Sequence, residues 1–299
     1  MAAIQAEQQR SFIAGESLED LNPAALSLKK FDWREFPWWF VALIIIAIGT
    51  LMVILTSPSF TKAFNTIIGG LRVTISATLT AFAIAVVLGL VTGLGRISNK
   101  VVSKNVATLY VELVRGVPML VLIFFVALVM VPALVTGSNK LGLALFEAGV
   151  LAESNFLSNL SIRDIPMFSR AVIALSVTYG AFLAEVFRAG IQSISKGQME
   201  AARSQGMSYG QAMRYIILPQ AIRNVLPALG NDFISMLKDS SLVSILAVGD
   251  ITQVARLYAA HSFRFGESYI SLAILYLTMT LSLSLIIKII ERRMAKNER

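Results

Sequence analysis

The sequence is nearly devoid of the side chains that hold metals and disulfides: its 299 residues include no cysteine and one histidine, His261. Without cysteine the chain forms no disulfide, no thiolate metal site and no cysteine nucleophile. A single histidine excludes a histidine metal cluster, and we expect His261 to be an ordinary surface residue. No paired catalytic acids and no Ser/His/Asp set occur, so the sequence argues against an intramembrane enzyme.

Charge is also scarce, because only 15% of the residues are charged against about 25% in a typical globular domain. Hydrophobic residues make up 56% of the chain, which predicts a membrane protein. The net charge of +8 is then expected to reflect cytoplasmic loops rather than nucleic-acid binding. No basic-then-apolar pattern precedes residue 37, so we expect no cleaved signal peptide.

A phosphate-binding loop of the form G-x-x-x-x-G-K-[ST] is missing as well. The stretches GLRVTIS (70–76) and GRISNK (95–100) lack its lysine position and spacing. We therefore predict that this chain is not an ATPase and binds no cofactor itself. A deeply placed series of acids, which would indicate a proton relay, is not evident either.

Long apolar stretches predict six membrane-spanning helices, since about 20 apolar residues cross the hydrocarbon core. The fifth is interrupted: an apolar stretch containing Asp232 is followed by KDSSL and then by further apolar residues. Broken backbone at this depth is tolerated where protein or a cavity surrounds it. The predicted spans are 37–56, 73–95, 109–135, 168–187, the interrupted one beginning at 225–237, and 268–287.

Basic residues fix the predicted orientation. The segment 188–223 has five basic residues and one acid, the loop 96–105 has three basic residues and no acid, and the tail 288–299 is also basic. The loops on the opposite face are close to balanced in charge. Because Lys and Arg favour the cytoplasmic side, we place both termini and the segment 188–223 in the cytoplasm.

A polar hairpin, EAARSQGMSYGQAMRYIILP (200–219), stands out inside this apolar chain. Ser195 with Gln198, and Ser208 with Gln211, have capping-box spacing, which predicts two short helices. Gly206 between them suits a left-handed helix end, and Pro219 is expected to end the second helix. In the second helix, one face is predicted to be shared by Tyr209, Met213, Ile216 and Ile217. These features fit either an amphipathic connector on lipid headgroups or a docking site for a cytosolic partner.

The hairpin resembles the signature of permease subunits of bacterial ABC importers. The matching positions are Glu200, Ala201, Ala202, Gly206, Ile216, Leu218 and Pro219. The stretches 111–125, 179–211 and 218–244 resemble the polar amino-acid branch of that family, the histidine, glutamine and glutamate type. By this resemblance, residues 200–207, Met207 included, would be a coupling helix that fits a groove of the ATP-hydrolysing subunit.

The resemblance implies an all-α, multi-pass protein of the bacterial inner membrane. A five-span core at 66–290 would contain the coupling loop 195–219, with an extra helix at 37–56 and cytoplasmic tails at 1–36 and 291–299. The implied partners are a cytosolic ATPase dimer that binds ATP and Mg, a second permease subunit, an external substrate-binding protein, membrane lipid and an amino acid. The extra helix and the long external stretch 136–167 depart from the compact family pattern. The alternative function is an ATP-independent secondary transporter or channel, which the broken fifth span alone suggests.

Two acid–arginine pairs lie near the cytoplasmic ends of predicted spans, Glu112 with Arg115 and Glu185 with Arg188. Each pair has i,i+3 spacing, which suits an ion pair on one helix face. They are interpreted either as such pairs, or as an internal gate or an orienting contact for the coupling loop.

A second polar group falls in the interrupted span, where buried charges usually face a cavity or a partner. We interpret it either as part of the substrate pathway, meeting the ammonium and carboxylate of an amino acid, or as a Lys–Asp pair, or as residues that mark the external interface. Its members are Asp232, Lys238, Asp239, Ser240 and Ser241.

Overall fold

The computed structural model describes residues 38–152 and 155–296, and every regular element within them is helical. The predicted tail 1–36 lies outside these residues, and the predicted tail 291–299 begins inside the last helix. The chain divides into two compact units, 1–50 and 51–299, which are described separately. The α-helices are α2 (Trp38–Thr56), α3 (Pro58–Ile67), α4 (Leu71–Ile97), α5 (Val101–Arg115), α6 (Met119–Phe125), α7 (Val131–Glu147), α8 (Phe156–Asn159), α9 (Met167–Gln192), α10 (Lys196–Ser204), α11 (Tyr209–Ala212), α12 (Leu218–Asp239), α13 (Ile251–Ser262) and α14 (Phe265–Lys296).

Shorter helical segments join several of these helices. Two of them, η4 and η6, are π-helical, and the others are 3-10 helices. A π-turn holds one residue more than an α-turn, so it shifts the faces of the residues that follow. The segments are η3 (Ile68–Gly70), η4 (Val126–Met130), η5 (Ile162–Asp164), η6 (Met213–Ile217) and η7 (Ser240–Leu246).

Four described helices are long and apolar enough to cross a membrane, and the count becomes five if one bent pair forms a single span. The four run over Pro58–Ile97, Met119–Glu147, Met167–Gln192 and Phe265–Arg293. The helix predicted at 37–56 is present as α2, which contains no charged residue. Whether α2 is a sixth span stays a prediction.

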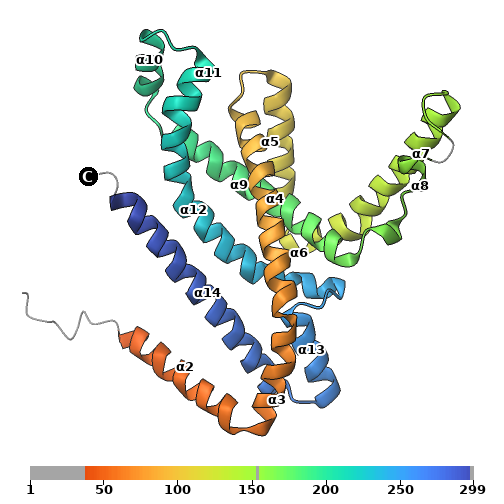
Figure 1. The fold of residues 1–299 in the computed structure, drawn as a ribbon, viewed down its shortest axis with the longest axis vertical. Helices are drawn as coiled ribbons and strands as arrows, with labels where there is room; N and C mark the ends of the chain where they lie inside the picture. The colour runs from red at the N-terminus through yellow and green to blue at the C-terminus, as the bar shows by residue number, and fades with distance from the viewer. Residues whose placement is uncertain (1–37, 153–154, 297–299) are drawn as a thin grey trace, which may run out of the picture. The chain divides into compact units, whose positions relative to one another are not determined.

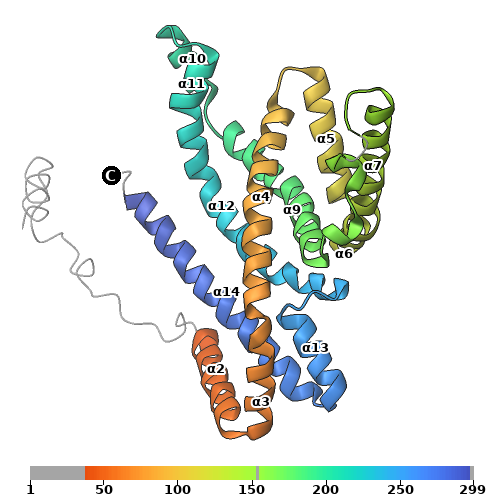
Figure 2. The same cartoon turned by 45° about the vertical axis from the view of Figure 1, so that its right-hand side comes forward.

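The core of the larger unit is built on close contact between α4 and α9 (Figures 1 and 2). One face of α4 has a small residue every four positions, and all of these are buried. This spacing lets two helix backbones approach closely, as membrane helices commonly do. The residues are Ala77, Ala81, Ala85, Gly89 and Gly93.

The third span differs from its predicted position. The helix predicted at 109–135 is broken, because α5 ends at Arg115 and α6 begins at Met119. Pro118 has no amide hydrogen and pushes the preceding residue out of helical geometry, which explains the break. The apolar span therefore runs from Met119 to Glu147, well into the stretch predicted to be an external loop.

The fifth span is interrupted, as predicted, but at a later position. The backbone stays helical through KDSSL, because α12 continues directly into η7. The break follows Leu246, where Ala247 adopts a left-handed φ of 57° and the Asp250 carboxylate caps α13 by accepting from the amides of Thr252 and Gln253. The two helical parts meet at a bend of 50°.

Pro219 does not end the second hairpin helix, contrary to the prediction. The chain remains helical from Tyr209 through η6 into α12. Pro219 is the second residue of α12, directly after the π-turn. The π-turn before it interrupts the regular α-helical hydrogen-bond pattern, so a proline, which lacks an amide hydrogen, is accommodated although the chain stays helical.

Some of the loops predicted to share a membrane side lie at the same end of the fold, but the stretch 136–167, also predicted to be external, does not join α3 and α13, because α7 extends away from them (Figures 1 and 2). The α10–α11 hairpin and the start of α5 are at one end of α4, whereas α3 and α13 are at the other (Figures 1 and 2). At the hairpin end, Ile97 of α4 and Met199 of α10 both pack against one buried apolar cluster. At the opposite end, Ile67 of α3 packs with Ile251 of α13.

Candidate functional site

A small apolar cluster anchors the hairpin at 195–219. It joins the ends of α4 and α9 to α10, η6 and the first turn of α12. Its buried members are Ile191, Ile217 and Ala221, and the partly buried Ile97, Ile194, Met199, Met213 and Ile216 pack against them. The hairpin is therefore fixed to three long helices rather than attached as a loose loop.

The first hairpin helix, α10, has a defined start and end. Its start is capped by the Ser195 hydroxyl, which accepts from the Gly197 amide at 3.3 Å. The predicted reciprocal bond from Gln198 is absent from the described contacts. The helix ends in a Schellman motif. Gly206 has φ +85°, its amide donates to the Arg203 carbonyl at 3.0 Å, and the Met207 amide donates to the Ala202 carbonyl at 3.2 Å.

The second hairpin helix begins with the predicted capping box. The Ser208 hydroxyl accepts from the Gln211 amide at 3.3 Å, and the Gln211 side chain accepts from the Ser208 amide at 2.8 Å. The predicted apolar face is only partly correct, because Tyr209 is 58% exposed. Tyr209 stands at the first helical position, before the π-turn that sets the phase of the later apolar residues.

The motif residues of the hairpin divide between its surface and its interior. Glu200, Ala201 and Gly206 are exposed, whereas Ala202 is only 5% exposed. The small size of Ala202 therefore serves packing within the hairpin. Of the remaining motif positions, Pro219 is exposed, and Met207 and Leu218 are half-buried. A partner arriving at this end would meet a polar surface with two small residues in it.

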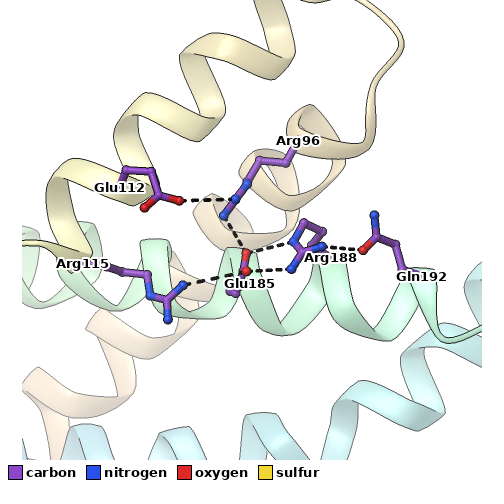
Figure 3. A network of polar contacts seen from close by, with 6 residues as sticks. All are labelled: Arg96, Glu112, Arg115, Glu185, Arg188 and Gln192. Carbon is purple, nitrogen blue, oxygen red and sulfur yellow. Dashed lines mark hydrogen bonds and ion pairs between the residues drawn. The ribbon is translucent and has the colours of Figure 1, made fainter.

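A charged cluster lies between α4, α5 and α9, with Glu185 at its centre (Figure 3). The Oε2 atom of Glu185 accepts from Arg96 at 2.6 Å and from Arg188 at 3.0 Å. Its Oε1 atom accepts from Arg188 at 2.7 Å and forms a longer ion pair with Arg115 at 3.8 Å. One carboxylate thus holds three guanidinium groups from three helices.

The predicted pairs are rearranged in this cluster. Glu185 and Arg188 pair as expected, but Glu112 and Arg115 are not paired with each other among the described residues. Glu112 contacts Arg96 at 3.5 Å, and Arg115 turns to Glu185. Arg96 was not predicted to be a member of this cluster. Its position in the last turn of α4 was the available signal, but its partners are distant in sequence.

The polar group of α12 lies at the end of that helix and in the first turn of η7. The hydroxyl of Tyr179, on α9, donates to Oδ2 of Asp239 at 2.6 Å. Ser240 is buried, and its hydroxyl donates to the Leu237 carbonyl at 2.7 Å. Asp232 is half-buried two helical turns before Asp239, on the same face of α12.

The remaining members of that group differ from expectation. Lys238 is exposed, and no ion pair joins it to Asp239 within the described part of the chain, so the predicted Lys–Asp pair is wrong. Ser241 is half-buried. Over residues 38–152 and 155–296, no group of three or more histidine, aspartate or glutamate side chains is arranged to hold a metal ion.

Comparison with known proteins gives consistent results. The family model of the binding-protein-dependent transport system inner membrane component matches residues 85–296. The probable glutamine ABC transporter permease protein GlnM of Bacillus subtilis is 36% identical over 234 residues, which cover 78% of this chain and 95% of GlnM. The glutamine transport system permease protein GlnP of Escherichia coli is 32% identical over 232 residues, covering 78% and 94%.

Solved structures show the same likeness. A crystal structure of an amino acid ABC transporter with histidines superposes with a TM-score of 0.63 at 38% identity, covering 79% of this chain and 97% of the other. An inward-facing structure of the MetNI methionine ABC transporter superposes with a TM-score of 0.54 at 16% identity, which supports the fold alone.

Proposed function

This chain belongs to the family of binding-protein-dependent transport system inner membrane components, and we propose that it imports a polar amino acid by docking an ATPase at residues 200–207. It is a multi-pass permease subunit of an ABC amino-acid importer. The ATPase dimer that binds ATP and Mg, the second permease subunit and the external binding protein are the partners that this function requires.

The docking proposal is supported by which side chains of α10 are buried and which are exposed. A helix that lies on lipid headgroups exposes a broad apolar face. In α10 the apolar side chains Met199 and Ala202 turn inward, and the exposed residues are polar or small. The surface of α10 thus suits a folded protein partner better than a lipid bilayer.

The anchoring of the hairpin offers a route for transmitting movement. The chain is helical from Tyr209 through η6 into α12, and the apolar cluster ties α10 to the ends of α4 and α9. A displacement of the hairpin by an ATPase would therefore move α12 directly. ATP drives alternating access only if its binding favours one of the two states of the transporter.

Residues of α12 and η7 are proposed to line the pathway of the amino acid. The carboxylates of Asp232 and Asp239 can accept from an ammonium group, and the exposed Lys238 can pair with a carboxylate. Ser240 and Ser241 add hydroxyl groups beside them. The two acids share one helix face, so they can act on the same ligand group in turn.

The charged cluster is proposed as a cytoplasmic gate. The cluster lies where α4, α5 and α9 approach each other. Glu185 of α9 pairs with Arg96, Arg115 and Arg188, and Glu112 of α5 pairs with Arg96. Among the described residues, the ion pair of Arg115 is the longest of the cluster at 3.8 Å, its guanidinium also lies over the Phe182 ring, and the side chain is 43% exposed, so it is the member that can exchange partners with least loss.

The proposed docking site is tested by tagging the chain, extracting its native membranes in mild detergent and quantifying the ATPase subunit that co-purifies. We expect Gly206→Arg to lower recovery of the ATPase by about tenfold or more, as for loss of a hot-spot contact. Gly206 is exposed and no atom lies within 4 Å of the position of an added Cβ, so the new side chain would project toward the partner.

Gly206→Ala is the matched control, because alanine meets the same left-handed strain of about 1–2 kcal/mol without a long charged side chain. Recovery of the ATPase should be largely retained in Gly206→Ala. Equal loss in both variants would assign the effect to backbone strain and contradict the docking proposal. If the chain instead purifies alone and still moves amino acids in vesicles, ATP-independent secondary transport is correct.

A further inference from the structure

Tyr179 is a buried polar residue whose hydroxyl bonds to one of the acids of the proposed pathway. Its side chain belongs to the main apolar core and is 3% exposed. The hydroxyl reaches out of that core from α9 to Oδ2 of Asp239 on α12. We propose that Tyr179 is a positioning residue that holds the Asp239 carboxylate toward the ammonium group of the transported amino acid. This inference depends on the proposed pathway.

The geometry gives the two oxygen atoms of Asp239 different roles. The 2.6 Å bond from the Tyr179 hydroxyl engages Oδ2, and a hydrogen bond to a charged acceptor is among the stronger ones. In the described part of the chain, no donor is bound to Oδ1. The carboxylate is thus held at one oxygen and has the other available to accept from a ligand.

The tyrosine ring itself is firmly placed. It packs in the core formed by α4, α9 and α12, and its centroid lies 6.1 Å from that of Phe182, at 50°. The Arg115 guanidinium lies 5.9 Å from the Phe182 centroid on the side of the charged cluster. A ring fixed by packing directs its hydroxyl to one point, which is what a positioning residue requires.

Asp239 needs such support because of its position in the chain. It is the last residue of α12, where the helix narrows into the 3-10 segment η7. Its nearest charged neighbour in sequence, Lys238, forms no ion pair with it among the described residues. Without the tyrosine hydroxyl, the described structure provides nothing else that orients this carboxylate.

The test uses Tyr179→Phe in the complete transporter, reconstituted with its ATPase and binding protein. The probe is whichever of the twenty standard L-amino acids the wild type takes up fastest. Losing a hydrogen bond to a charged group should raise KM for that amino acid by about tenfold. The maximal rate should change by a smaller factor, because the ring and its packing remain.

Tyr110→Phe is the matched control. Tyr110 is another tyrosine in the same region, and its hydroxyl donates to the Val177 carbonyl of α9 at 2.5 Å. Removing that hydroxyl also deletes a hydrogen bond to α9 but does not involve Asp239. If the role of Tyr179 is merely structural, both variants should lower the melting temperature by similar amounts and neither should raise KM.

Asp239→Asn separates the two proposals. We expect it to raise KM, and we expect Tyr179→Phe to add little in its presence, since residues that act through one interaction are not additive. If Asp239→Asn leaves KM unchanged, the pathway proposal fails. If Asp239→Asn raises KM and Tyr179→Phe does not, or if their effects simply add, the positioning role of Tyr179 is wrong.

Discussion

Glu185→Gln should destabilise the protein by about 2–3 kcal/mol, somewhat below the 3–5 kcal/mol for removing one partner of a fully buried ion pair. The side chain is 26% exposed, which is why we expect the smaller value. Glutamine keeps the size of the residue but removes the carboxylate that pairs with Arg115 and Arg188 among the described residues, and it leaves Arg96 with only the longer contact to the exposed Glu112. Thermal unfolding of the purified protein in detergent measures the effect.

Glu112→Gln provides the comparison within the same cluster. Its side chain is 66% exposed and has a single contact, 3.5 Å from Arg96. Exposed ion pairs contribute about 0–1 kcal/mol, so this change should be nearly neutral. Adding Arg96→Gln to Glu185→Gln should recover part of the loss, because one unpaired guanidinium is removed. Equal stability of the Glu185 and Glu112 variants would show that Glu185 is not the centre of the cluster.

Gly93→Ala is the second change with a large expected effect. A Cβ atom at this position would lie 2.8 Å from the Ala184 carbonyl oxygen and 3.0 Å from Cβ of Phe187. Because a backbone atom cannot move aside as a flexible side chain does, α4 and α9 would have to separate. Overpacking of this kind costs about 1–3 kcal/mol, and the separation would also loosen the neighbouring charged cluster.

The sign of this effect makes it a sharp test. In an open helical position, Gly→Ala stabilises by about 1 kcal/mol through helix propensity. Gly137 of α7 is such a position, with no atom within 4 Å of an added Cβ. We expect Gly137→Ala to keep or raise the melting temperature and Gly93→Ala to lower it. A rise in both would contradict close backbone contact between α4 and α9.

The local features of the hairpin were predictable because each is decided within a few residues. The Ser208–Gln211 capping box and the left-handed Gly206 were predicted from spacing and are present in the structure. The Ser195–Gln198 capping box does not form: the Ser195 hydroxyl accepts from the Gly197 amide, and the Gln198 amide donates to the Ser195 carbonyl. Pro219 failed as a helix end because a π-turn, which has no clear sequence signal, precedes it.

Polar residues gave a misleading signal for the break in the fifth span. KDSSL was interpreted as an interruption because charges and hydroxyls are costly in an apolar helix. The helix continues there because the side chains find partners: Tyr179 satisfies Asp239, and the Leu237 carbonyl accepts from Ser240. The break lies instead at Ala247, where the left-handed backbone and the Asp250 cap redirect the chain.

The sequence by itself determined that this is a helical membrane permease of the ABC importer family with a polar hairpin. Those conclusions depend on composition, apolar length and a compact motif, all of which are local properties. The tertiary structure alone decided that Arg96 joins Glu185, 89 residues away, and that Tyr179 bonds Asp239, 60 residues away. Such partners are chosen by which helix faces meet, and the small residues of α4 set that contact by letting two backbones approach closely.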